Sequence, residues 1–209
     1  MDSNEIYKLI LGSQSPRRLE LLKWLEIPFE VRPSYCKEES EFELPLDFAK
    51  DIATQKGRSV MSDLKGKVEN PLVIAADTVV SISTKILGKP KNSKEAAEML
   101  LLLSGKKHMV TTAVYLASLK KEKVFAIESE VTFSAISEDI LERYLKTEDS
   151  LDKAGSYGIQ GMGLTFIDKV EGSYSNVVGF PLSHFITELK DFLGYVNDEQ
   201  GQYRKLFGI

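Results

Sequence analysis

The chain has 209 residues, of which 43% are hydrophobic and 28% are charged, and its formal net charge is −4. This composition is typical of a globular protein with a hydrophobic core, and the length suits one large domain or two small ones. A negative net charge does not favour general nucleic-acid binding, so any phosphate group must be bound by a local basic cluster.

Several other classes of protein are disfavoured by the sequence. No apolar run reaches the length of a membrane span, and the N-terminus lacks the pattern of a secretory signal, so we expect a cytoplasmic protein that does not contact a membrane. The single cysteine, Cys36, cannot form an internal disulfide, and the only histidines, His108 and His184, are far apart in sequence. A zinc site built from Cys and His is therefore not expected.

The first half of the chain alternates strand and helix patterns. Gly12 allows a sharp turn, Ser15 can cap a helix, and Pro16 suits the first helical position. Asn92, with Glu95 three residues later, forms a capping-box-like start for another helix. We expect strands over residues 6–11, 29–32 and 72–82, helices over 16–25, 46–64 and 92–103, and an acidic loop over 38–43.

The second half is richer in strand patterns. Two β-rich runs, 110–117 and 124–133, flank a charged turn and predict an antiparallel hairpin. A short helix over 137–146, strands over 164–170 and 174–178, a closing helix over 181–193 and a peripheral tail after Gly194 complete the prediction. The sum is an α/β fold, with a mixed twisted sheet and flanking helices, in a single domain over residues 1–209 whose two lobes surround a central cleft. Such a cleft is the usual place for a ligand.

The stretch from Ser13 to Arg18 is the most informative local feature. It places Arg17 and Arg18 in the first turn of a predicted helix, where the helix dipole disfavours cations. A bound anion would explain this arrangement, and a phosphate matches the arginine fork. The alternative is two solvated arginines on an exposed turn.

Asp77 interrupts an otherwise apolar predicted strand. A buried carboxylate without a partner is costly, so Asp77 must either face a cleft at a strand end or be paired with a cation or donor. Strand ends in open α/β sheets are where ligands bind. The alternative is a buried aspartate that caps a loop.

Two lysines also break the local pattern. Lys56 lies on the apolar stripe of its helix, from which its ammonium group either reaches a phosphate in the cleft or extends along the surface to solvent. Lys89 is held in a rigid turn between Gly88 and Pro90, which by itself is compatible with a solvated loop lysine. The chain contains no Walker A pattern, so neither lysine belongs to a P-loop.

A glycine-rich loop follows over residues 152–161. Its glycines permit close approach of the backbone to a ligand, and Gln160 can both donate to and accept from a base edge, although ordinary turns use the same glycines. With Arg17, Arg18, Lys56 and Lys89 for phosphates, and Asp77 and the acidic loop for a metal, the residues favour phosphate-ester or anhydride chemistry with Mg²⁺ or Mn²⁺.

These segments, in this order, resemble the Maf family of nucleoside triphosphate pyrophosphatases. The matching segments are 9–22 (LILGSQSPRRLELL), 53–60 (ATQKGRSV), 73–80 (VIAADTVV), 87–114, 152–161 (DKAGSYGIQG) and 172–182 (GSYSNVVGFPL). The resemblance implies an α/β fold with a cleft and hydrolysis of a nucleoside triphosphate to the monophosphate and pyrophosphate. The forms of the last two segments are similar to the branch that acts on dTTP and UTP.

The resemblance also implies roles for individual residues. Those expected to bind substrate are Ser13, Arg17, Arg18 and, for the base, Gln160. Those expected to be catalytic are Asp77, Lys56 and Lys89, with Asp77 as general base or metal ligand. Glu38 is expected to hold Mg²⁺ or Mn²⁺ with Asp77, and Glu39 is the fallback, because residues 35–37 depart from the family's acidic run.

The expected function is therefore hydrolysis of dTTP and UTP, with a nucleoside triphosphate as the partner and no nucleic acid. One alternative is a house-cleaning pyrophosphatase for other modified nucleotides. A second is a nucleotide-binding regulator of cell division with little turnover. The sequence leaves the oligomeric state open, a homodimer included.

Overall fold

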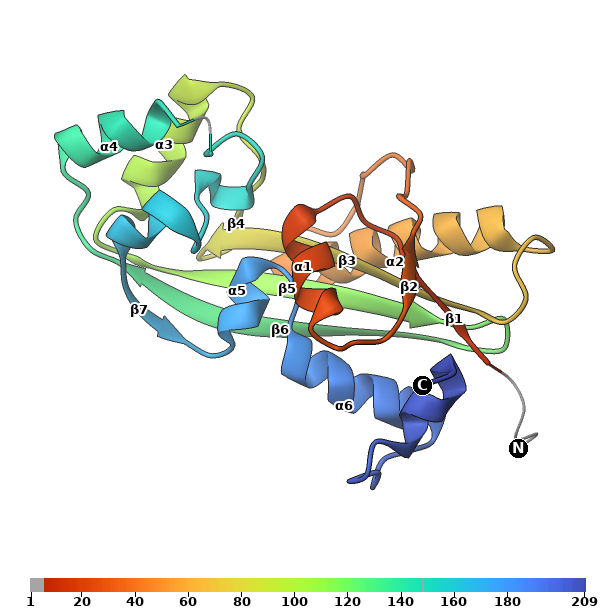
Figure 1. Ribbon diagram of the computed structural model, residues 1–209. Coiled ribbons are helices and arrows are strands. Elements are labelled where there is room, and N and C mark those ends of the chain that lie inside the picture. The colour runs from red at the N-terminus through yellow and green to blue at the C-terminus, as the bar shows by residue number, and fades with distance from the viewer. Residues whose placement is uncertain (1–5, 148) are drawn as a thin grey trace.

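The computed structural model describes residues 6–147 and 149–209. Within these residues, seven strands form one mixed sheet in the order β2-β1-β3-β5-β6-β7, with β4 paired to β3 (Figure 1). The expected mixed sheet with flanking helices is confirmed. The strands are β1 (Lys8–Leu11), β2 (Phe29–Val31), β3 (Pro71–Ile82), β4 (Lys85–Leu87), β5 (Lys107–Ala117), β6 (Glu122–Phe133) and β7 (Ile167–Glu171).

One edge of β3 is shared by two short strands that leave a gap between them. Parallel strand β1 pairs with β3 as far as Ile74, and antiparallel strand β4 pairs with it from Val80 onward. Over residues 75–79, no other described strand pairs with this edge, while the opposite edge of β3 pairs with β5 throughout. Asp77 and Thr78 therefore lie where the sheet is open on one side.

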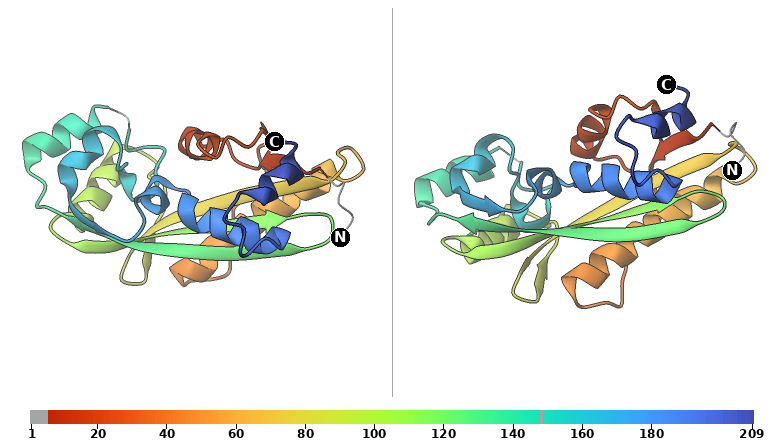
Figure 2. Two further views of the ribbon diagram at one scale, coloured as in Figure 1. Left: turned by 60° about the horizontal axis from the view of Figure 1, so that its bottom comes forward. Right: turned by 90° about the horizontal axis from the view of Figure 1, so that it is seen from below.

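The helices cover the two faces of the sheet unequally. Helix α2 (Pro45–Leu64) covers one face, and α1 (Pro16–Lys23), α5 (Tyr174–Val178) and α6 (Leu182–Leu193) lie on the other (Figure 2). Helices α3 (Ser93–Leu103) and α4 (Glu138–Leu145) lie at the far end of the sheet, beside the short 3₁₀ segments Ala154–Ser156 and Gly161–Phe166.

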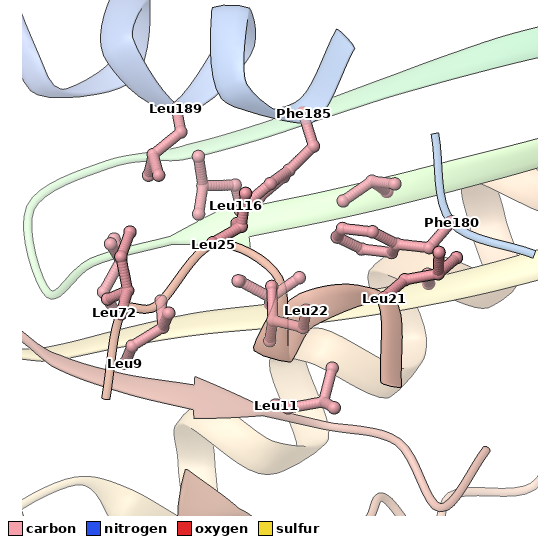
Figure 3. Packing of buried hydrophobic residues seen from close by; sticks show 14 of the residues in the cluster. Leu9, Leu11, Leu21, Leu22, Leu25, Leu72, Leu116, Phe180, Phe185 and Leu189 are labelled. Carbon is pink, nitrogen blue, oxygen red and sulfur yellow. The ribbon is translucent and has the colours of Figure 1, made fainter. Parts of the chain in front are cut away.

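Apolar side chains form a separate core on each side of the sheet. On the α1 side, leucines from α1, β1 and β3 pack against Phe185 and Leu189 of α6 (Figure 3). Each such side chain, when fully buried, stabilises the fold by about 1.5–3 kcal/mol. On the α2 side, Gly57 permits the helix to approach β5, because a Cβ there would lie 1.9 Å from the ring of Tyr115. The close approach brings Lys56, the preceding residue, near the sheet.

Two sequence predictions about the fold are wrong in part, and one strand was not predicted. Residues 174–178 form helix α5 rather than a strand, because Ser173 accepts a capping hydrogen bond from the Asn176 amide and Gly179, at φ 116°, ends the helix. Only Ile167–Glu171 of the expected strand 164–170 extends, since a 3₁₀ segment precedes it. The short strand β4, which forms a hairpin with β3, was not expected.

The expected peripheral tail is also corrected. Tyr203 and Phe207 are buried in the core between α1 and α6. The tail is tied to the N-terminal elements by hydrogen bonds from the Tyr7 amide to the Leu206 carbonyl (2.7 Å) and from Arg204 to the Leu25 carbonyl (2.9 Å). Tyr195 and Leu206 of the tail pack against the same core. Among the described residues, no helix has the length and apolar character needed to cross a membrane.

Candidate active site

A cavity of about 860 Å³ surrounds the open edge of β3. It lies between the loop that enters α1, helix α2, the turn after β4 and residues 149–160. The residues singled out in sequence that line it are Ser13, Arg17, Arg18, Glu38, Lys56, Asp77, Lys89 and Gln160. Residues as far apart in sequence as Ser13 and Gln160 thus line the same cavity. Glu39, the alternative to Glu38, does not line this cavity.

The loop after β1 turns sharply to begin α1. The Gly12 amide donates to the Ile74 carbonyl of β3 (2.7 Å), which keeps the loop beside the open edge. Pro16 is at the start of the helix, as expected. Ser15 occupies the N-cap position, but its side chain makes no capping hydrogen bond; its amide instead donates to the Ser13 hydroxyl at 3.2 Å.

Arg18 extends across the cavity and contacts three other elements. Its Nε donates to the Gly179 carbonyl (2.9 Å) and its two terminal nitrogens to the hydroxyls of Ser13 (3.3 Å) and Thr78 (2.9 Å). Burial lowers the pKa of the guanidinium, an effect that the nearby charges of Asp77 and Glu38 oppose. All three hydrogen-bond acceptors are neutral, so no carboxylate of the described residues contacts the guanidinium charge. The solvated reading of Arg18 is wrong.

Arg17 points to the opposite side of the cavity. Its guanidinium contacts the Asp152 carboxylate at 3.2 Å, and Asp152 also contacts the ammonium group of Lys153 at 2.6 Å. Burial opposes ionisation of Asp152, but the hydrogen bonds and charges of Lys153 and Arg17 outweigh it and hold the pKa below its usual range. Arg17 therefore links the α1 loop to the glycine-rich segment.

On the α2 face, Lys56 lies between two carboxylates. Its Nζ is 2.7 Å from Asp77 Oδ1 and 2.8 Å from Glu38 Oε2, and the side chains of Lys56 and Asp77 are only 13% and 12% exposed. Lys56 therefore faces the cavity rather than solvent, and Asp77 pairs with a cation rather than capping a loop. The neighbouring Glu39 instead pairs with Lys37 at 2.6 Å, so Glu38 is the acidic residue that the loop delivers to the site.

Lys89 and Gln160 enter the cavity from its other walls. Both are exposed, and neither forms a side-chain hydrogen bond or ion pair with another residue in the described ranges. Their two loops are joined by a hydrogen bond from the Gly155 amide to the Gly88 carbonyl (3.1 Å). Both side chains are thus available to a ligand.

Sequence reasoning missed the neutral partners of Arg18. Thr78 directly follows Asp77 and points to the opposite face of β3, where it contacts Arg18. A signal was present in the sequence, since Asp77 and Thr78 both interrupt the apolar run, but only Asp77 was assigned a role. Lys153 lies in the glycine-rich loop, and Asp149 and Asp152 bind its ammonium group. It was assigned no role from the sequence.

Two carboxylates of the site, those of Asp77 and Glu38, are possible ligands for a divalent cation. Among the described residues, no group of three or more His, Cys, Asp or Glu is gathered as a complete metal site. Asp77 and Glu38 nevertheless converge on one point, the Lys56 nitrogen. Mg²⁺ is commonly held by one or two carboxylates together with substrate phosphates and water. The two carboxylates therefore fit a cation that arrives with its substrate.

The chain belongs to the family of Maf-like proteins, whose model matches residues 8–192. A dTTP/UTP pyrophosphatase of Bacillus cytotoxicus is 45% identical over 186 residues, covering 88% of this chain and 95% of that protein. One of Bacillus pumilus is 44% identical, with coverage of 88% and 96%. A solved nucleoside-triphosphatase / dITP/XTP pyrophosphatase from Mycobacterium abscessus is 14% identical with a TM-score of 0.41, covering 91% of this chain and 99% of that one. A likeness that weak carries no conclusion.

Proposed function

We propose that this protein hydrolyses dTTP and UTP to the nucleoside monophosphate and pyrophosphate. The observation that carries the proposal is the opening of an anion-binding loop and the Asp77–Lys56–Glu38 cluster into one cavity. The names of the relatives, which align over nearly their whole length, supply the nucleotide.

The arrangement of charges suits a triphosphate. Arg18 and Arg17 lie at the start of α1, Lys56 lies across the open edge of β3, and Lys89 lies on the turn after β4. Guanidinium groups bind phosphate oxygens through paired hydrogen bonds, and lysines act as point charges. We assign the phosphates to these four side chains and the pyrimidine edge to Gln160, whose amide can both donate and accept.

Hydrolysis then requires a water molecule to attack the α-phosphorus. Asp77 accepts the proton of the attacking water, an oxygen–phosphorus bond forms, and the bond to the bridging oxygen breaks to release pyrophosphate. Lys56 contacts Asp77 at 2.7 Å and holds it close to the reacting group. Arg17, Arg18 and Lys89 stabilise the negative charge that develops on the leaving pyrophosphate. Asp77 and Glu38 would hold Mg²⁺ or Mn²⁺, whose charge neutralises phosphate oxygens when bound.

The test is pyrophosphate release from a panel of dTTP, UTP, CTP, GTP, ATP, ITP and 7-methyl-GTP, with Mg²⁺ or Mn²⁺ and with EDTA. We expect metal-dependent release from dTTP and UTP and little from the others. Release mainly from ITP or another modified nucleotide would keep the chemistry and overturn the substrate. Binding of dTTP without release would favour a regulator.

A further inference from the structure

A chain of hydroxyl groups extends from Arg18 across two neighbouring strands, along the face of the sheet that α1 covers. Thr78 on β3 and Thr112 on β5 are paired across the two strands, and their Oγ1 atoms lie 3.0 Å apart. Thr112 is fully buried, and its Oγ1 lies 3.0 Å from the carbonyl oxygen of Asn176 in α5. These hydrogen bonds therefore join Arg18 in the cavity to α5, which lies on the same face of the sheet.

Counting hydrogens fixes the direction of this chain. A carbonyl oxygen can only accept, so the single hydroxyl hydrogen of Thr112 goes to Asn176. Thr112 must then accept from Thr78, whose one hydrogen is used in turn. The Thr78 oxygen is left as an obligate acceptor, and it faces the Arg18 nitrogen at 2.9 Å.

Asn176, at the end of this series of hydrogen bonds, is itself fixed by further hydrogen bonds. The Asn176 amide nitrogen donates to the Val110 carbonyl (2.9 Å) and to the Ser129 hydroxyl (3.0 Å), and the residue is fully buried. Helix α5 also ends at Gly179, whose carbonyl accepts from Arg18 Nε. Two of the three acceptors that orient the guanidinium thus depend on α5, Gly179 directly and Thr78 through Thr112.

We propose that Thr112, acting through Thr78, is a positioning residue that fixes the orientation of Arg18 for the substrate phosphates. Three of the five N–H groups of Arg18 are used by Gly179, Ser13 and Thr78, which leaves two, one on each terminal nitrogen. These two remain for an anion. The inference rests on the proposed function, in which Arg18 binds the triphosphate.

The test is Thr112→Val, which keeps the shape and removes the hydroxyl. Thr78 then loses its acceptor, and its own hydrogen competes with Arg18 for the space between them. We expect kcat/KM for dTTP to fall about tenfold, as for loss of one oriented hydrogen bond to a charged group, and Thr112→Ser to restore it. The matched control is Thr111→Val: Thr111 is equally buried but points to the other face, toward Glu128.

A double-mutant cycle separates positioning from general destabilisation. In an Arg18→Lys background, Thr112→Val should cause no further loss, because the group that it positions is gone. An equal loss in both backgrounds, an equal loss in Thr111→Val, or native kinetics in Thr112→Val would overturn the proposal. If Thr112→Val does not fold, Thr112→Ala, which also removes the hydroxyl, is measured in the same cycle, and the same outcomes decide.

The proposed function can fail independently of the positioning of Arg18 by Thr112 through Thr78, which we call the relay. A wild-type protein that releases no pyrophosphate from dTTP or UTP would refute the function. Calorimetric binding of inorganic tripolyphosphate to the same variants would then test the relay, with about tenfold weaker binding expected for Thr112→Val and none of that loss in the Arg18→Lys background. Equal affinities in wild type and Thr112→Val would refute the relay.

Discussion

Two adjacent residues of β3, Asp77 and Thr78, serve two different clusters on opposite faces of the sheet. On the α2 face, the positive charge of Lys56 is balanced by Asp77 and Glu38 within 2.8 Å. On the α1 face, the positive charge of Arg18 is surrounded by a carbonyl and two hydroxyls. Both clusters open into the same cavity.

The difference lies in what each cluster lacks. A buried charge with neutral partners remains electrostatically unbalanced, whereas a charge between two carboxylates is already compensated. In the proposed function, the unbalanced charge of the Arg18 side receives an anion. The Lys56 side instead holds the Asp77 carboxylate, by an ion pair of 2.7 Å, close to the bound group. One strand, open on one edge, thus presents the proposed binding group on one face and the proposed reacting group on the other.

The largest effect is expected from Asp77→Asn, which removes the reacting carboxylate and leaves the Arg18 side intact. Loss of a general base reduces turnover by about 10²–10⁴-fold. Lys56 keeps Glu38 as a partner, so the fold should persist. Steady-state kinetics with dTTP measure kcat, and thermal unfolding checks the fold. Near-native turnover would show that the two clusters do not divide the work in this way.

Mild acid should lower the stability of the fold through His108, which belongs to neither cluster. This residue contacts the Tyr157 hydroxyl at 2.7 Å, beneath the cavity wall, and burial lowers its pKa to about 4. Because the unfolded chain binds a proton near the usual pKa of 6.5, stability falls as the pH drops from about 6.5 to about 4. The full contribution of one such shift is about 3 kcal/mol.

Urea unfolding across this pH range measures the effect. The control is His108→Gln, a polar side chain that does not titrate, which should have a shallower decline in unfolding free energy between pH 6.5 and pH 4. Parallel curves for the two proteins would show that His108 is not the group responsible.

An intermediate effect is expected from Arg18→Lys. A lysine carries three donors on a single nitrogen, so it cannot reach Gly179, Ser13 and Thr78 and also bind phosphate. We expect kcat/KM for dTTP to fall by about 10–100-fold, the range for loss of one or two hydrogen bonds to a charged group. Arg17→Lys, which keeps its single ion pair with Asp152, should cost less. Equal losses at the two positions would contradict the special role given to the Arg18 surroundings.

The smallest effect is expected from Gln160→Ala, which touches neither cluster. Gln160 is exposed at the cavity wall and makes no side-chain hydrogen bond to the described residues, so its removal should leave stability unchanged. The preference for dTTP over CTP should fall by about fivefold, since one lost hydrogen bond is worth about 1 kcal/mol. The measurement compares kcat/KM for the two nucleotides. Unchanged preference would assign base selection to another wall.

The sequence by itself determined most of the strand and helix alternation, the start of α1 at Pro16 and six of the charged residues that line the cavity (Arg17, Arg18, Glu38, Lys56, Asp77 and Lys89). These follow from local chemistry: apolar periodicity, the backbone limits of proline, and the cost of burying Asp77 in an apolar strand. Residues 174–178 show the limit of such reasoning. Their valines favour a strand, but the cap at Ser173 and the left-handed Gly179 make a helix.

Only the tertiary structure decided which partners those charges have. The choice of Glu38 over Glu39, the position of Lys56 between two carboxylates and the neutral surroundings of Arg18 all depend on contacts between distant segments. The same holds for the tail, where Tyr203 and Phe207 reach the core beside α1. The sequence pattern shows which charged residues would be costly to bury. The partner that offsets this free-energy cost is determined by how the elements pack on both faces of β3.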